Sequence, residues 1–223
     1  MARRPLVNVR LAGYCGLVAP VVAFICILLA IWSSSWFTWT ESWLSDLGGT
    51  PGQGTPAVAG VNAAFLFNNG LMLSALLGLG LVGGLLGFPG LDSTWGRRGL
   101  GLLALDMVAL FGVGLWPSNV GVMHYYASVT FFMLIPPSLL ALAHALVQAG
   151  DKGHAHMMRL LGAIAMVTVP LIELLPQPWG HNALSESVPA VVIGVASAVA
   201  GHWLLGVGGN DECVSGDRGI EDD

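Results

Sequence analysis

Charged residues are scarce in this chain. Asp, Glu, Lys and Arg make up 9% of its 223 residues, against about 25% in an average soluble domain. Hydrophobic residues make up 55%, and the mean hydropathy is +0.74. This balance excludes an ordinary water-soluble protein, and no nucleic-acid partner is expected. The composition therefore predicts an integral membrane protein whose surroundings, and first partners, are membrane lipids.

Cysteine is also rare, with three residues in the chain. Cys15 and Cys26 fall in the same apolar run, and eleven residues of helix would separate them by about 16 Å. That distance is too long for a disulfide bond. Cys213 lies in the acidic C-terminal tail, so the sequence offers no disulfide framework.

Long hydrophobic runs, by contrast, dominate the sequence. A helix needs about 20 apolar residues to cross the roughly 30 Å hydrocarbon core of a membrane. We therefore expect an all-α fold, an integral membrane bundle of six transmembrane helices within residues 1–208, followed by an acidic and disordered cytoplasmic tail at 209–223. The six runs cover about residues 11–32, 61–88, 99–116, 121–149, 158–176 and 186–208.

Positive charge is missing from every second connection between these runs. The segments at about 33–60, 117–120 and 177–185 contain no Lys or Arg. Because Lys and Arg are retained on the cytoplasmic side, both termini are predicted to be cytoplasmic in a plasma-membrane protein. An aromatic belt of Trp32, Trp36, Trp39, Trp43, Trp116 and Trp179 would mark the outer interface, and Trp95 and Trp203 the inner one.

Two local patterns predict details of this bundle. Thr38 to Glu41 reads as a capping box, and Gly48 and Gly49 would end the segment, which predicts a short interfacial helix in the first outer loop. In the second run, Gly80 and Gly84 are spaced four apart, as are Gly83 and Gly87. That spacing predicts close helix packing in lipid.

Polar residues inside apolar runs are the candidates for function, because an ionisable group at membrane depth costs a few kcal/mol. We expect them to converge on one outward-facing cavity. The acid-base candidates are Asp106, His124, Glu186 and Asp46. The substrate-binding candidates are Asn68, Asn69, Ser118, Asn119 and Glu173. His124 and His181 are candidate ligands for a divalent metal.

Structural interpretations stand beside these functional ones. Asp106 bonded to an Asn would hold two helices together without any chemistry. His124 and Glu186 fall at the ends of runs, where interfacial polar residues are common. The cluster therefore suggests a site only when its members are taken together.

Four segments in these positions resemble a known family. In order along the chain they are Trp43-Leu44-Ser45-Asp46-Leu47-Gly48, Phe65-Leu66-Phe67-Asn68-Asn69-Gly70-Leu71, Gly114-Leu115-Trp116-Pro117 with His124, and Ala183-Leu184-Ser185-Glu186. Together they look like the six-span archaeal and bacterial membrane family catalogued as uncharacterised domain 998, over about residues 43–189. The resemblance implies six helices and an outward polar cluster and brings no established activity. The family's pattern implies an Arg after the glutamate, where this chain has Ser187.

Three classes of function remain open. An enzyme, such as a membrane hydrolase or transferase, would act on a lipid or lipid-linked substrate with the acid-base candidates above. A transport or binding protein would use the same groups for a solute or for protons. A haem protein would use His124, His144, His181 and His202, although two histidines about 20 residues apart on one helix stand about 30 Å apart.

Overall fold

The computed structural model describes residues 7–49, 62–174 and 182–216, and these fold as an α-helical bundle. The predicted all-α class is confirmed. Three short 3₁₀ helices, η1 (Leu44–Gly48), η3 (Pro89–Leu91) and η4 (Ser118–Val120), lie in connections within these ranges. The long helices are α1 (Val9–Trp32), α2 (Ala63–Leu85), α3 (Thr94–Leu115), α4 (Val122–Gln148), α5 (Lys152–Leu174) and α6 (Ala183–Gly216).

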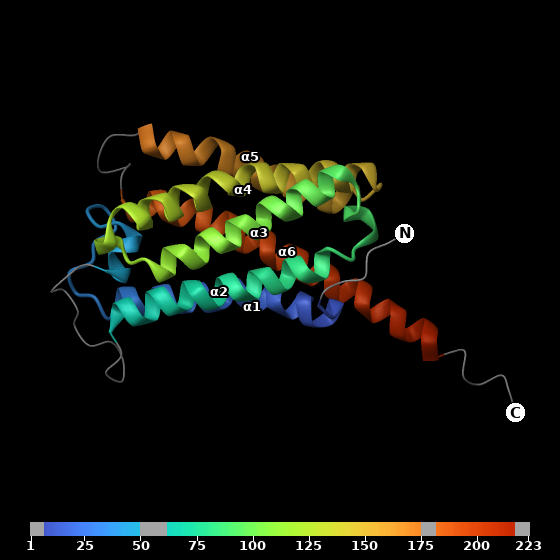
Figure 1. Cartoon of the computed structure of the whole chain (residues 1–223), viewed down its shortest axis with the longest axis horizontal. Helices are drawn as coiled ribbons and strands as arrows, with labels where there is room; N and C mark the ends of the chain where they lie inside the picture. The colour runs from blue at the N-terminus through green and yellow to red at the C-terminus, as the bar shows by residue number, and fades with distance from the viewer. Residues whose placement is uncertain (1–6, 50–61, 175–181, 217–223) are drawn as a thin grey trace, which may run out of the picture.

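The six long helices lie side by side and close into a ring. Each packs against the next along the chain, and α6 returns to pack against α1. Helix α6 also contacts α2 and α4, so it crosses the interior of the bundle. The start of α1 and the end of α6 lie at the same end of the bundle, and η1 lies at the opposite end (Figure 1). We call that opposite end, with η1, η4 and the start of α6, the η1 end.

Five of the described helices are long and apolar enough to cross a membrane: α1, α2, α3, α4 and the Ala183–Gly206 part of α6. Helix α5 covers most of the predicted run at 158–176 but is not among the five. Side chains in its last turns lie outside the described residues, to which this count is limited. The chain is therefore a helical protein with several helices able to span a membrane.

Side chains just before three helices explain where these helices begin. The Asn8 side chain accepts hydrogen bonds from the backbone N–H groups of Arg10 and Leu11. Asn62 accepts one from Phe65 at 2.7 Å, and Ser93 accepts one from Gly96 at 3.1 Å. Such caps satisfy backbone donors that have no partner within the helix.

Small residues let α1 and α2 approach closely, as the glycine spacing predicts. A Cβ at Gly84 would overlap the Cβ of Ala12, and a Cβ at Gly80 would lie 3.0 Å from the Cys15 sulfur. The predicted role of Gly80 and Gly84 in helix packing is confirmed. The seam between α1 and α6 is equally tight, because a Cβ at Gly201 would lie 2.6 Å from the carbonyl oxygen of Gly13.

A proline inside α1 links α1 to α6. Pro20 has no N–H, so the carbonyl of Gly16 loses its usual helical donor. The Ser197 hydroxyl of α6 donates to that carbonyl at 2.9 Å. The hydrogen bond that Pro20 removes from α1 is thus replaced by one from a side chain 181 residues away in the sequence.

The first connection differs from the predicted interfacial helix. Its helical segment is η1, which begins at Leu44 rather than near Thr38. The Trp43 N–H donates to the Asp46 carboxylate at 2.9 Å, whereas the Thr38 N–H donates to the Ser42 hydroxyl. The Trp43–Asp46 bond therefore stands where a bond between Thr38 and Glu41 was expected. Leu44 and Leu47 are buried against the bundle, so η1 packs on protein.

Candidate functional site: an internal cavity closed by η1

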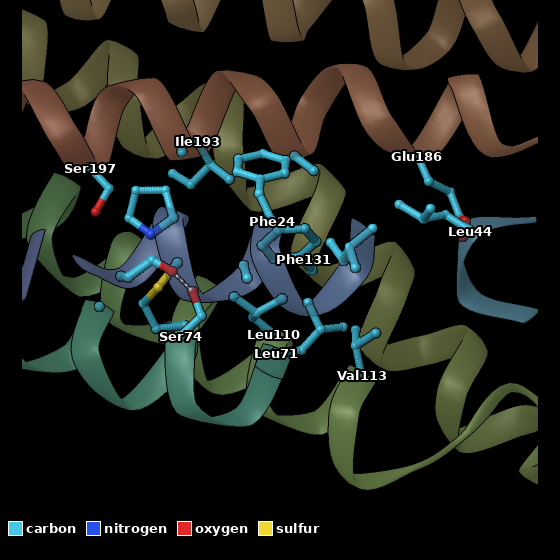
Figure 2. Close-up of a pocket in the computed structure, with 18 of the residues that line it drawn as sticks. Phe24, Leu44, Leu71, Ser74, Leu110, Val113, Phe131, Glu186, Ile193 and Ser197 are labelled. Carbon is cyan, nitrogen blue, oxygen red and sulfur yellow. Dashed lines mark hydrogen bonds between the residues drawn. The ribbon is translucent and has the colours of Figure 1, made fainter. Parts of the chain in front are cut away.

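A cavity lies inside the bundle between α1, α2, α3, α4 and α6, with η1 at one end. Its volume is about 90 Å³, whereas one water molecule needs roughly 10–15 Å³ on the same measure. The wall is mostly apolar and aromatic, with Phe24, Leu71, Leu110, Phe131 and Ile193 facing one another along it (Figure 2). The cavity is therefore large enough for an elongated apolar group.

The few polar groups of the wall lie mainly at its two ends. Glu186 and Leu44 stand at the η1 end, and Ser74 and Ser197 stand at the other (Figure 2). Eleven residues of α6 separate Glu186 from Ser197, which corresponds to about 16 Å. The hydroxyls of Ser74 and Ser197 donate to the backbone carbonyls of Ala19 and Gly16, each at 2.9 Å. Those two hydroxyls are therefore engaged with the helices themselves.

Glu186 is held by η1. The backbone N–H of Ser45 donates to one carboxylate oxygen of Glu186 at 2.9 Å, and the Ser45 hydroxyl donates to the other at 2.9 Å. A second bond joins the same elements, because the Ala183 N–H donates to the Ser42 carbonyl at 2.8 Å. The carboxylate thus fixes η1 over the start of α6 and lines the end of the cavity.

His124 lies on α4 near the η1 end, and its imidazole bridges two partners. The Nδ1 atom is 2.7 Å from the Trp116 carbonyl oxygen, and the Nε2 atom is 3.2 Å from the Ser128 hydroxyl oxygen. A carbonyl oxygen only accepts, so Nδ1 must be the donor. In the neutral ring Nε2 is then the acceptor for the Ser128 hydroxyl. His124 is buried, and Ser128 lines the cavity.

Asn68 of α2 holds η1, and Asn119 of η4 lies close to it. The Asn68 side-chain amide donates to the Gly48 carbonyl at 2.7 Å. A Cβ at Gly48 would lie 2.5 Å from Asn68 Oδ1, and one at Gly49 would lie 2.7 Å from Asn119 Oδ1. A side chain at either position would displace these neighbours, because η1 lies this close to α2 and η4. The four segments that carry the family resemblance thus meet at the η1 end.

Asp106 is buried at 0% exposure and is not part of the wall of this cavity. Neither carboxyl oxygen has a hydrogen-bond partner among the described residues. On the same helix, Gly99 lies against Leu142 of α4 and Gly112 lies near Ala127. Asp106 is therefore level with the part of α4 that precedes Pro136 and Pro137, whose missing N–H groups free two backbone carbonyls.

The remaining candidate residues lie apart from the cavity or outside the residues that the structure describes. Asp46 accepts the Trp43 N–H within η1, and Ser118 begins η4. Asn69 is exposed, and its amide donates to the Phe65 carbonyl one turn back. Glu173 lies on α5, but its side chain is outside the described residues, as is all of His181. Within the described ranges, no three His, Cys, Asp or Glu side chains gather as a metal-ligand set.

The structure therefore brings together Glu186, His124 and Asn68 at the η1 end and leaves Asp106 deeper in the bundle. Sequence reasoning missed Ser45 and Ser128. Ser128 carried a signal, because residues four apart on a helix face one another. Ser45 carried none beyond its place in the segment that resembles the family, since 141 residues separate it from Glu186.

These features define a helical membrane protein with an apolar internal cavity and a hydrogen-bonded closure at one end. The chain belongs to the family described as Protein of unknown function (DUF998), whose model matches residues 17–203. No curated protein and no solved structure matches the chain.

Proposed function

We propose that this multi-pass membrane protein binds one elongated apolar chain of a lipid or lipid-linked molecule inside the bundle. The observation that carries the proposal is the cavity itself, which is lined almost entirely by apolar and aromatic side chains. Ligand sites of this kind combine an apolar wall with a few placed polar groups that fix the ligand's orientation. Glu186 and the Ser128–His124 pair are such groups here.

The polar groups set the direction of the bound molecule. The hydroxyls of Ser74 and Ser197 are engaged by backbone carbonyls, so that end suits the tip of an apolar chain. Glu186 and Ser128 offer polar atoms nearer the η1 end. A lipid would therefore enter with its chain toward Ser197 and its polar group toward η1.

The proposed setting is the plasma membrane, crossed six times with both termini cytoplasmic. Helix α5 packs between α4 and α6, as a sixth spanning helix would. The start of α1 and the end of α6 lie at the same end of the bundle, which fits an even number of crossings (Figure 1). The η1 end would then face outward, and the site would draw its ligand from the outer leaflet.

Photo-crosslinking tests the proposed binding. The purified protein would be placed in lipid bilayers that contain a phosphatidylglycerol with a diazirine near the end of one acyl chain. We expect crosslinks on residues of the cavity wall, such as Phe131 and Ile193, besides those on the lipid-facing surface. Ala190→Phe fills part of the cavity, and Val191→Phe, on the exposed face of the same helix, is its matched control.

The two variants separate binding from surface contact. Ala190→Phe should reduce crosslinks at Phe131 at least tenfold, and Val191→Phe should leave them unchanged. Equal crosslinking of both variants, or no crosslink within the cavity of the wild-type protein, would show that no lipid chain occupies it.

A further inference from the structure

The geometry of α4 points to a second property of this cavity: Ser128 is a nucleophile for acyl transfer, and His124 is its general base. The substrate class is a lipid ester whose acyl chain occupies the cavity. This inference rests on the proposed function, because the cavity must first hold the acyl chain. It adds bond-making chemistry that binding alone does not require.

The hydrogen bonds of His124 give its ring the protonation pattern that a base needs. Nδ1 donates to the Trp116 carbonyl at 2.7 Å, which leaves the lone pair of Nε2 directed at the Ser128 hydroxyl at 3.2 Å. An activated serine has this arrangement, in which a third group orients the base and the base contacts the nucleophile. Here the third group is a backbone carbonyl instead of a carboxylate.

Ser128 differs from other hydroxyl residues in these helices. Serine and threonine inside helices commonly donate to a backbone carbonyl three or four residues back. Thr168 donates to the carbonyl of Ile164, Ser187 to that of Ala183, and Ser138 to that of Ile135. Ser128 instead bonds to an imidazole, and it does so in the wall of a cavity.

The position of Ser128 suits an ester. Ser128 is six residues, about 9 Å, along α4 from Val122. An ester bond lies between the headgroup and the chain of a lipid, so a chain that extends toward Ser197 would place its ester near the η1 end. The aromatic residues Phe131 and Phe132 follow Ser128 on the cavity wall and would pack against the chain.

The reaction balances with water as the second substrate. The Ser128 oxygen attacks the ester carbonyl carbon while its proton moves to His124 Nε2. The carbon–oxygen bond to the alcohol breaks, and Nε2 returns the proton to the leaving alcohol, which leaves an acyl group on Ser128. Water then attacks the same carbon, gives one proton to Nε2, and releases the fatty acid as the proton returns to Ser128. Another alcohol in place of water would give transfer instead of hydrolysis.

A covalent probe tests the nucleophile. Full-length protein in bilayers would be treated with a hexadecyl fluorophosphonate, in which a serine oxygen displaces fluoride from phosphorus. We expect one stable adduct, mapped by mass spectrometry to Ser128. Ser128→Ala should abolish it, and Ser138→Ala, on the same helix and outside the cavity wall, should label at the wild-type rate. His124→Gln should slow labelling about 100-fold or more, the usual contribution of a general base.

The outcomes distinguish this inference from the proposed function. A wild-type protein that takes up no adduct, while the diazirine lipid still crosslinks to Phe131, would overturn the nucleophile and leave lipid binding in place. Failure of both experiments would overturn both proposals. Wild-type labelling rates in His124→Gln would overturn the base, since a purely structural bond to Ser128 would not set the rate of phosphonylation.

Discussion

Ser45 holds the carboxylate of Glu186 from two sides, with its N–H on one oxygen and its hydroxyl on the other, each at 2.9 Å. One residue of η1 thereby closes the end of a cavity whose wall comes from five helices. Because a typical hydrogen bond contributes about 0.5–1.5 kcal/mol, the two bonds add to the burial of Leu44 and Leu47 in fixing η1 on the bundle.

Glu186→Gln should destabilise the protein more than Ser45→Ala. Glutamine offers one oxygen acceptor in place of two, so one partly buried donor of Ser45 loses its partner, at about 1–3 kcal/mol. Ser45→Ala removes one bond and keeps the N–H contact. Thermal unfolding in detergent measures both, and the double variant should show that the two effects are not additive. Strict additivity would mean that the two residues do not interact.

Ser197→Ala should cost about 1 kcal/mol in the wild-type protein and much less in a Pro20→Ala background. Alanine at position 20 restores an N–H that can donate to the Gly16 carbonyl, so the Ser197 hydroxyl becomes dispensable. Ser74→Ala is the matched control, because its partner is the Ala19 carbonyl. An equal loss for Ser197→Ala in both backgrounds would contradict the role of Pro20.

Two glycines of α6 should respond to alanine in opposite ways. A Cβ at Gly201 would lie 2.6 Å from the backbone of α1, whereas a Cβ at Gly206 meets nothing within 4 Å. Gly201→Ala should therefore destabilise by about 1–3 kcal/mol, as overpacking does. Gly206→Ala should be neutral or stabilise by up to about 1 kcal/mol through helix propensity. Melting temperatures that move in the same direction would show that α1 and α6 do not pack as described.

The seam between α1 and α6 also shows how far sequence reasoning reaches. Composition and apolar runs predict the helices, because membrane thickness fixes their length. Gly80 and Gly84 predict a close seam, because a small residue every four positions lies on one helix face. The pairing of Ser197 with Gly16 follows from no local pattern. It needs the neighbour of α1 to be known, and helix neighbours are a property of the whole fold.

The candidate site was also predictable only in part, because the sequence shows which residues are polar but not which helix faces meet. His124 and Glu186 stand out because polar groups near membrane depth are costly. Glu186 lines the cavity, and His124 contacts Ser128, which also lines it. Asp106 stands out most in the sequence, yet it lies outside the cavity wall. The free-energy cost of a polar group at membrane depth identifies a residue that must have a structural or functional role. It does not show which face of the helix that residue occupies.

Asp106→Asn should keep wild-type stability, and Asp106→Leu should lose about 1–3 kcal/mol. Neither carboxyl oxygen has a partner among the described residues. We therefore suppose that a protonated carboxyl, like an amide, reaches a carbonyl that Pro136 or Pro137 leaves without a helical donor. Leucine cannot donate. Thermal unfolding of the two variants measures the difference. A leucine variant that melts at or above the wild-type temperature would exclude this donor role.

Thiol labelling tests the proposed orientation. In a protein without its native cysteines, Glu41→Cys at the η1 end should react with an impermeant maleimide added to intact cells. Gly153→Cys, exposed in the first turn of α5, should react only after the cells are opened. Positive residues near Gly153 should keep that turn on the cytoplasmic side. The reverse pattern would place the η1 end in the cytoplasm.

A density map of the wild-type protein in lipid nanodiscs tests the central claim most directly. The account predicts one continuous, unbranched density between Phe24, Phe131 and Ile193, which runs from the level of Glu186 to that of Ser197. A cavity that holds only separate water peaks, or that is closed by repacked side chains, would contradict the binding of a lipid chain.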